Sequence, residues 1–147
     1  MTEVELLLEI YKIQVSRSEH FEKLRFYMSG LILTLAVALL GVVSLDSPGG
    51  PTDALVGIAI AALGSFGFVA SLLHSKRAER HGTLAGKYRE QIDRLMPSAG
   101  FDATHSAVRA EYRQTHLNRL WAYLHLLIIG SGLLVAVLAI ITTGPPE

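Results

Sequence analysis

The sequence predicts an all-α membrane protein with three transmembrane helices and helical extensions in the cytoplasm. Two observations predict this fold class: three long stretches carry no charged residue, and all 13 lysines and arginines fall on one predicted side of them. Half of the 147 residues are hydrophobic and 18% are charged, whereas about a quarter of the residues in a typical soluble domain are charged. Basic and acidic residues are equal in number, which gives no indication of nucleic acid binding. The absence of cysteine excludes disulfides and thiolate metal sites.

The three predicted spans cover residues 27–45, 54–74 and 120–143. Each is long enough to cross a hydrocarbon core of about 30 Å, which needs about 20 helical residues. The first span is not a cleaved signal peptide, because the residues before it carry five acids and a signal begins with a short basic segment. Residues 46–53 are then a short loop, and residues 144–147 are a tail.

Positive charge predicts the orientation. Four basic residues precede the first span and nine lie between the second and third, whereas the short loop and the tail have none. Because lysine and arginine are retained in cytoplasmic segments, we expect the N-terminus and residues 75–119 to be cytoplasmic. The loop and the C-terminus are expected to be external.

The cytoplasmic segments are also predicted to be helical. Residues 1–26 form an amphipathic helix, which begins with Thr2 and Glu5 at the spacing of a capping box. Its apolar face either covers the chain's own hairpin or packs in part on another subunit. Residues 75–119 form that hairpin: its first helix ends near Met96 because Pro97 follows. Its second helix starts after the N-cap Asp102 and continues into the third span.

Small residues recur at intervals of three, four and seven, a pattern that allows close approach of helix backbones in lipid. The small-residue faces of the second and third spans together exceed what the packing of one three-helix subunit requires. They therefore predict seams between the subunits of a homo-oligomer. Outside the membrane a helical glycine costs about 1 kcal/mol relative to alanine, so glycines there predict a tight helix contact. The predicted packing residues are Gly57, Ala61, Gly64, Ala78, Gly82, Gly86, Gly132, Ala136 and Ala139, and the first span has a similar stripe at Gly30, Thr34 and Ala38.

No motif predicts an enzyme, a cofactor or a metal site. The stretch 82–88 is one residue short of a phosphate-binding loop and lacks its hydroxyl residue. Ser131 and His125 share a helix but lie about 240° apart around its axis, so they cannot pair as nucleophile and base within one subunit. His125 is predicted to make a polar contact between helices near the membrane surface, and the alternative is a pH-sensitive role.

A pore would need several subunits. The spans contain no aspartate, glutamate, lysine or arginine of the kind that carriers place at mid-membrane. Thr34, Ser65 and Ser71 are therefore the candidates for lining a pore between subunits. The alternative is that each hydroxyl bonds to the backbone of its own helix.

The chain resembles the RipA-type family of small octameric bacterial membrane proteins over nearly its whole length. The residues that carry the likeness are Tyr11-Lys12 before the first span, Ser75-Lys76-Arg77 after the second, and Met96 to Asp102, "MPSAGFD". The family's asparagines in and below these spans are absent, and Gly100 stands where the family has a second proline. The resemblance implies a ring of eight subunits in the bacterial cytoplasmic membrane.

The layout is also similar to the SLATT domains, helical membrane modules of bacterial nucleotide-signalling defence systems. The shared features are the basic helix "RSEHFEKLRFY" before the first span and the charged helix "RAERHGTLAGKYRE" after the second, whereas the third span departs from the two-span pattern. The likeness implies a pore-forming effector of antiphage defence, controlled through the cytoplasmic helices by a protein or nucleotide-signal partner. The alternative function is a non-conducting oligomeric scaffold that recruits protein partners.

Overall fold

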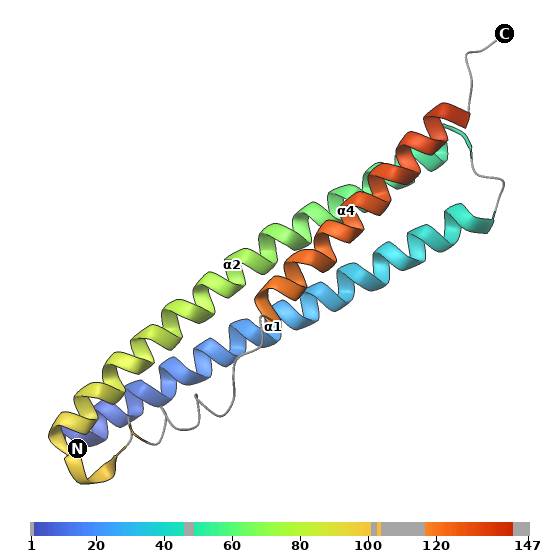
Figure 1. Cartoon of the computed structure of the whole chain (residues 1–147). Coiled ribbons are helices and arrows are strands. Elements are labelled where there is room, and N and C mark those ends of the chain that lie inside the picture. Colours follow the sequence, from blue (N-terminus) through green and yellow to red (C-terminus); the bar gives the residue numbers. More distant parts are fainter. Residues whose placement is uncertain (1, 46–48, 101–102, 104–116, 143–147) are drawn as a thin grey trace. The chain divides into compact units, whose positions relative to one another are not determined.

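The computed structural model describes residues 2–45, 49–100, 103 and 117–142, and every regular element among them is helical. Helix α1 spans Glu3–Leu45, α2 spans Pro51–Leu95, a single 3-10 turn η1 spans Pro97–Ala99, and α4 spans Leu117–Thr142 (Figure 1). Each of the three long helices contains a segment long and apolar enough to cross a membrane. The predicted all-α class with three such helices is confirmed.

The helices continue across the predicted boundaries between membrane spans and cytoplasmic segments. Helix α1 joins the predicted cytoplasmic helix 1–26 to the predicted span 27–45 without a break. Helix α2 starts at Pro51, three residues before the predicted start, and continues through the charged segment to Leu95. Helix α4 is described from Leu117, three residues before the predicted third span, and the residues 104–116 through which this helix was expected to run lie outside the described residues. A change from apolar to charged side chains does not interrupt the backbone hydrogen bonds, so the helices continue.

Local signals set the helix ends. Glu5 Oε2 accepts a hydrogen bond from Thr2 N at 2.6 Å, and Thr2 Oγ1 accepts one from Glu5 N at 3.3 Å, which confirms the predicted capping box. The last helical hydrogen bond of α2 joins Met96 N to Ile92 O at 2.8 Å, directly before Pro97. Gly100 then takes a left-handed conformation with φ of 57°. The predicted N-cap Asp102, the second arm of the hairpin (104–116) and the tail lie outside the described residues.

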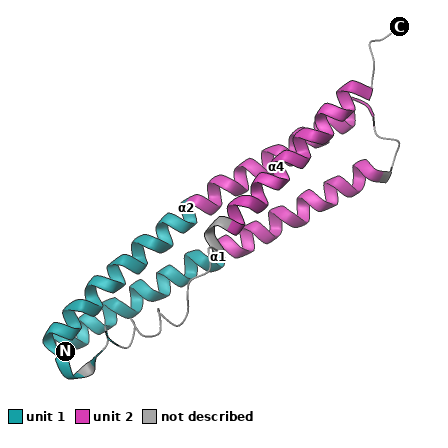
Figure 2. Cartoon of the chain, viewed as in Figure 1, with its two compact units in different colours: residues 1–24, 73–117 teal, residues 25–72, 118–147 magenta. Residues whose placement is uncertain are grey.

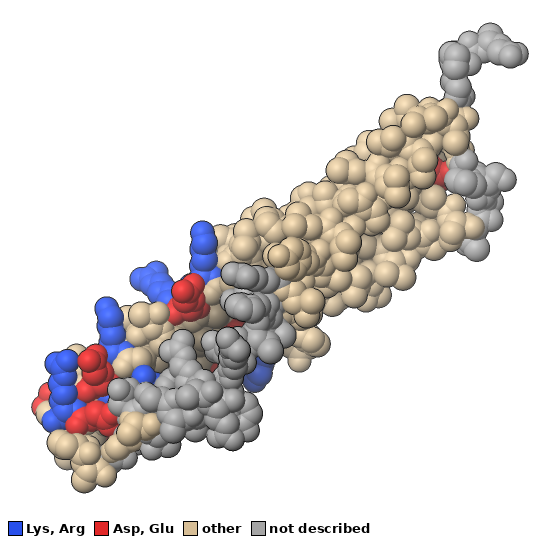
Figure 3. Space-filling view, viewed as in Figure 1, with Lys and Arg blue, Asp and Glu red and all other residues tan. Residues whose placement is uncertain are grey.

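The chain divides into two compact units, coloured separately in Figure 2. Unit 1 consists of residues 1–24 and 73–117, and unit 2 consists of residues 25–72 and 118–147. Lysine, arginine, aspartate and glutamate side chains cover much of the surface of unit 1, as Figure 3 shows. In unit 2, Arg25 and Asp53 are the only charged side chains that the structure describes.

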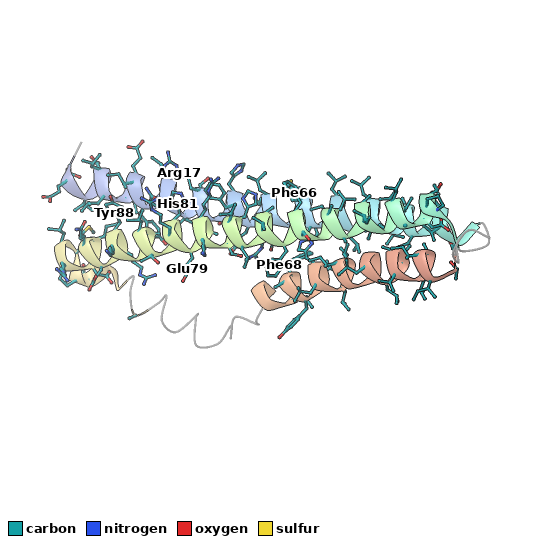
Figure 4. All side chains as sticks on the ribbon, turned by 90° about the horizontal axis from the view of Figure 1, so that it is seen from above. Arg17, Phe66, Phe68, Glu79, His81 and Tyr88 are labelled. Carbon is teal, nitrogen blue, oxygen red and sulfur yellow. The ribbon has the colours of Figure 1, made fainter. Side chains whose placement is uncertain are left out.

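Unit 1 is held by contacts between the first part of α1 and the last part of α2. The Phe21 ring stacks on His81 with centroids 5.6 Å apart and an interplanar angle of 9°. The Arg77 guanidinium lies 5.7 Å from the centre of the same ring, within the range of a cation–π contact. His81 lies between the two helices (Figure 4), and its Nδ1 is 2.7 Å from Gln14 Oε1. The N-terminal part of α1 therefore packs on the last part of α2, which is the first arm of the predicted hairpin.

The expected tight contact at the glycines of unit 1 is not found among the described residues. A Cβ built on Gly82 would lie 3.8 Å from Ser18 Oγ, which is an ordinary van der Waals distance. A Cβ on Gly86 would have no described atom within 4 Å. The close approach is instead at Ala78, which is buried and whose carbonyl accepts a hydrogen bond from Ser18 Oγ at 3.0 Å. Alanine is small enough for this contact, so it does not need glycine.

Candidate functional site

The centre of unit 2 is a seam between α2 and α4 that is built from small residues. A Cβ on Gly57 would lie 2.5 Å from Ala136 N and 2.7 Å from Gly132 O. A Cβ on Gly132 would in turn lie 2.5 Å from Ala61 N and 2.6 Å from Gly57 O. The backbones therefore touch directly, and glycine is required at both positions because a methyl group would collide with backbone atoms.

The seam continues along both helices. A Cβ on Gly64 would lie 2.9 Å from Ile129 N and 3.0 Å from the side chain of Ile128. Ala136 and Ala139 of α4 are 6% and 3% exposed, so they lie inside the unit as well. The helices are antiparallel, because later residues of α2 contact earlier residues of α4.

This geometry corrects one expectation. The small-residue faces of the second and third spans were expected to exceed the needs of a single subunit and so to form seams between subunits. They pack on each other within one chain, since each of the two helices supplies the surface that the other needs. The stripe that remains uncovered is on α1: Cβ atoms on Gly30 and Gly41 would meet no described atom within 4 Å, and Thr34 and Ala38 are exposed.

A buried polar pair lies at one end of the seam. Ser29 of α1 is 1% exposed and His125 of α4 is 0% exposed, and Ser29 Oγ is 3.0 Å from His125 Nε2. The predicted interhelical polar contact of His125 is confirmed. Ser29 belongs to the buried stripe of α1, which recurs at intervals of four, three and four and consists of Arg25, Ser29, Ile32 and Ala36.

Helix α2 makes room for the imidazole. A Cβ on Gly67 would lie 2.5 Å from His125 Nδ1 and 2.8 Å from Ile32 Cδ1, and it would overlap His125 Cε1. Only glycine leaves space for the ring at this point. His125 therefore contacts both other helices of unit 2: one ring edge faces Ser29 of α1 and the other faces the backbone of α2.

The hydrogen bonding of the ring favours one tautomer. His125 Nδ1 is buried and has no hydrogen-bond partner among the described residues. If Nε2–H donates to Ser29 Oγ, only a lone pair on Nδ1 remains unused. The other tautomer would leave a buried N–H without an acceptor, which native structures rarely contain. The pair is therefore best described as a neutral histidine that donates to a serine.

The distance between Ser29 and His125 would also suit a nucleophile and its base. Such a pair needs access for a substrate and a third group that orients the base. Both side chains are covered by their own unit, and the described residues place no hydrogen-bonding group on Nδ1. The arrangement holds the register of the helices, and it offers no reacting atom to a substrate in this conformation.

Two of the three hydroxyls that were expected to line a pore between subunits bond to the backbone of their own helix. Thr34 Oγ1 donates to Gly30 O at 2.9 Å, and Ser65 Oγ donates to Ala61 O at 2.8 Å. These are the bonds to their own helix that the alternative interpretation expected. Ser71 is 6% exposed and so lies inside the unit.

Sequence reasoning missed Ser29 and Gly67. Ser29 was overlooked because its partner is on a different helix, 96 positions away. Gly67 follows Gly64 by three positions, so the spacing of the small residues in α2 would have included it. Comparison of the chain with protein-family models, with curated proteins and with solved structures finds no match.

Proposed function

We propose that this chain is an integral protein of the bacterial cytoplasmic membrane, embedded through unit 2, which works as a homo-oligomeric pore-forming effector. The observation that carries the membrane assignment is the outer surface of unit 2. Large aliphatic side chains are exposed along all three of its helices, and the two described charged side chains stand near its ends. Leu31, Leu127 and Ile141, for example, are 58%, 71% and 69% exposed.

A lipid environment accounts for this surface. Exposure of a leucine or isoleucine to water forfeits about 1.5–3 kcal/mol relative to burial. A monomeric soluble protein rarely exposes a contiguous apolar patch larger than a few hundred Å². Surrounding lipid would therefore cover the exposed aliphatic side chains of unit 2. In the orientation that the basic residues predict, the N-terminus is cytoplasmic and the C-terminus is external.

The packed interior of unit 2 supports a pore between copies. Ile60 and His125 are 0% exposed and Ser29 is 1% exposed, so side chains fill the centre of the three helices. Conduction would then require several copies arranged in a ring, which agrees with the octamer that the family resemblance implies. A protein or nucleotide-signal partner that acts on unit 1 would supply the trigger.

Copies are proposed to meet through the uncovered stripe of α1, residues 30–41. Small residues favour helix association in lipid, where packing replaces the hydrophobic effect. Ala38→Phe should therefore reduce the oligomer mass measured by native mass spectrometry while the subunit stays folded. Ala136→Phe is the matched change on the internal seam, and it should destabilise the subunit itself. An oligomer that is unaffected by Ala38→Phe would remove this surface from the proposal.

A non-conducting scaffold is the second candidate, and one observation favours it. The hydroxyls of Thr34 and Ser65 donate to their own helices, and Ser71 is buried, so few polar groups are left for a water-filled lining. Current recordings from purified protein in planar bilayers separate the two functions. The effector should give discrete conductance steps when its trigger is present. An intact oligomer that never conducts with its trigger would instead identify the scaffold.

A further inference from the structure

All aromatic residues of unit 2 lie at one end of it. They are Phe26 and Tyr27 of α1, Phe66 and Phe68 of α2, and Trp121 and Tyr123 of α4. Phe66 and Phe68 are labelled in Figure 4. From residue 28 to 45, from 51 to 65 and from 124 to 142, the three helices contain no phenylalanine, tyrosine or tryptophan.

The contacts around His125 show that these residues share one level. Ser29 and Gly67 both touch His125, so the three helices can be aligned at these positions. Each helical residue rises about 1.5 Å, so the six aromatic residues fall within a band about 8 Å thick along the helix axes. Phe26 and Trp121 meet edge to face within it, with ring centroids 5.8 Å apart.

The band faces outward. Phe26, Tyr27 and Tyr123 are 60%, 69% and 61% exposed, and Phe66 is 59% exposed. These rings do not fill the core of unit 2, which consists of Ile32, Ala36, Ile60 and Ile128. An outward-facing ring with a hydroxyl or an N–H suits the boundary between hydrocarbon and headgroups, where its body is in lipid and its polar atom is in water.

The length of unit 2, measured from the aromatic band to its opposite end, agrees with the thickness of a bilayer. From the outer edge of the band to the far ends of α1 and α4, the helices extend about 30 Å, which equals the thickness of a hydrocarbon core. Arg25 lies at the level of Trp121 by the same alignment, so a charged residue stands at the edge of the band. At the opposite end the sequence itself contains no phenylalanine, tyrosine or tryptophan, so no second band can form there.

We propose that this aromatic band is a surface for the headgroup and ester layer of the lipids, and that it anchors unit 2 at one face of the bilayer only. The inference rests on the proposed membrane function. The aliphatic end, which has no aromatic anchor, is free to adjust to bilayers of different thickness. Trp121 should therefore keep a constant depth below the surface when the acyl chains are shortened or lengthened.

The single tryptophan of the chain makes the test direct. The wild-type protein is reconstituted into phosphatidylcholine–phosphatidylglycerol vesicles that carry a nitroxide either near the headgroup or near the end of the acyl chain. Trp121 fluorescence should be quenched several-fold more by the shallow nitroxide than by the deep one. The preference should persist in vesicles of shorter and of longer acyl chains.

A relocated tryptophan separates the possible failures. In Trp121→Phe/Leu133→Trp the probe moves about 18 Å along α4 to a side chain that is 53% exposed. Its quenching should favour the deep nitroxide. Equal or stronger quenching of wild-type Trp121 by the deep nitroxide would overturn the anchor and leave membrane insertion standing. If neither nitroxide quenches either protein, insertion itself is wrong, and the proposed function fails with it.

Discussion

Replacement of Gly132 by alanine tests the seam between α2 and α4 most sharply. The added methyl group would lie 2.5 Å from Ala61 N and 2.6 Å from Gly57 O. Both atoms belong to the backbone, so no change of side-chain rotamer relieves the collision. Two non-bonded atoms are comfortable at about 3.5 Å, so the helices would have to separate by about 1 Å.

The expected loss follows from that separation. Overpacking of a filled interior costs about 1–3 kcal/mol. For a chain of this length, the unfolding midpoint should then fall by about 3–10 °C. The measurement is thermal unfolding of the detergent-solubilised protein, followed by circular dichroism. Gly57→Ala should cause a similar loss, and the double variant should lose less than the sum, since helices already separated accommodate the second methyl group.

Gly130→Ala is the matched control on the same helix. Gly130 is exposed, and a Cβ on it would meet no described atom within 4 Å. Its midpoint should stay the same or rise, because alanine is the better helix former. If Gly132→Ala is as stable as wild type while Gly130→Ala behaves as expected, the close backbone contact is refuted.

Three further changes probe other contacts. Ser29→Ala leaves His125 Nε2 without its partner and should cost about 1–2 kcal/mol of unfolding free energy in the same assay. Ser65→Ala is the control and should change the stability little. Equal losses in the two variants would contradict a special role for the buried pair. Gly67→Ala should displace the imidazole, so the ¹⁵N chemical shifts of His125 should change, and unchanged shifts would show that the ring does not touch α2. Gly86→Ala should raise the free energy of unfolding by up to about 1 kcal/mol, and a loss would restore the tight contact that the sequence suggested.

The helices were predictable because their signals are local or cumulative. Uncharged runs of about 20 residues fix the number of apolar segments. Thr2 with Glu5 marks a helix start through hydrogen bonds between near neighbours, and Pro97 marks a helix end because it disfavours helical geometry at the residue before it. The pairing of Gly57 with Gly132 was not predictable in the same way. A small-residue stripe shows that a helix can be approached closely, but not by which helix. The two stripes were therefore assigned to other subunits, although they complete each other within one chain.

At the candidate site, too, the sequence predicts the kind of contact but not the residue that makes it. A histidine in an apolar helix predicts a polar contact, because the ring nitrogens need a partner away from water. Its partner could be identified only after the helices were placed, since Ser29 and Gly67 are on two different helices. At Gly82 and Gly86 a cost in helix propensity was interpreted as evidence of packing against the N-terminal helix or the returning arm. The described part of the N-terminal helix makes no tight contact there, and the returning arm, 104–116, lies outside the described residues.

The orientation of unit 2 across a membrane is the central claim, and cysteine labelling tests it directly. The chain has no cysteine, so each introduced thiol is the only target. The positions are Thr52 at the start of α2, Ser16 in unit 1 and Ile58 on the outer surface of unit 2, all of them exposed. In intact bacterial cells, a membrane-impermeant maleimide should label Thr52→Cys at once, Ser16→Cys only after the cytoplasmic membrane is permeabilised, and Ile58→Cys under neither condition. Labelling of Ser16→Cys in intact cells, or ready labelling of Ile58→Cys, would contradict the account.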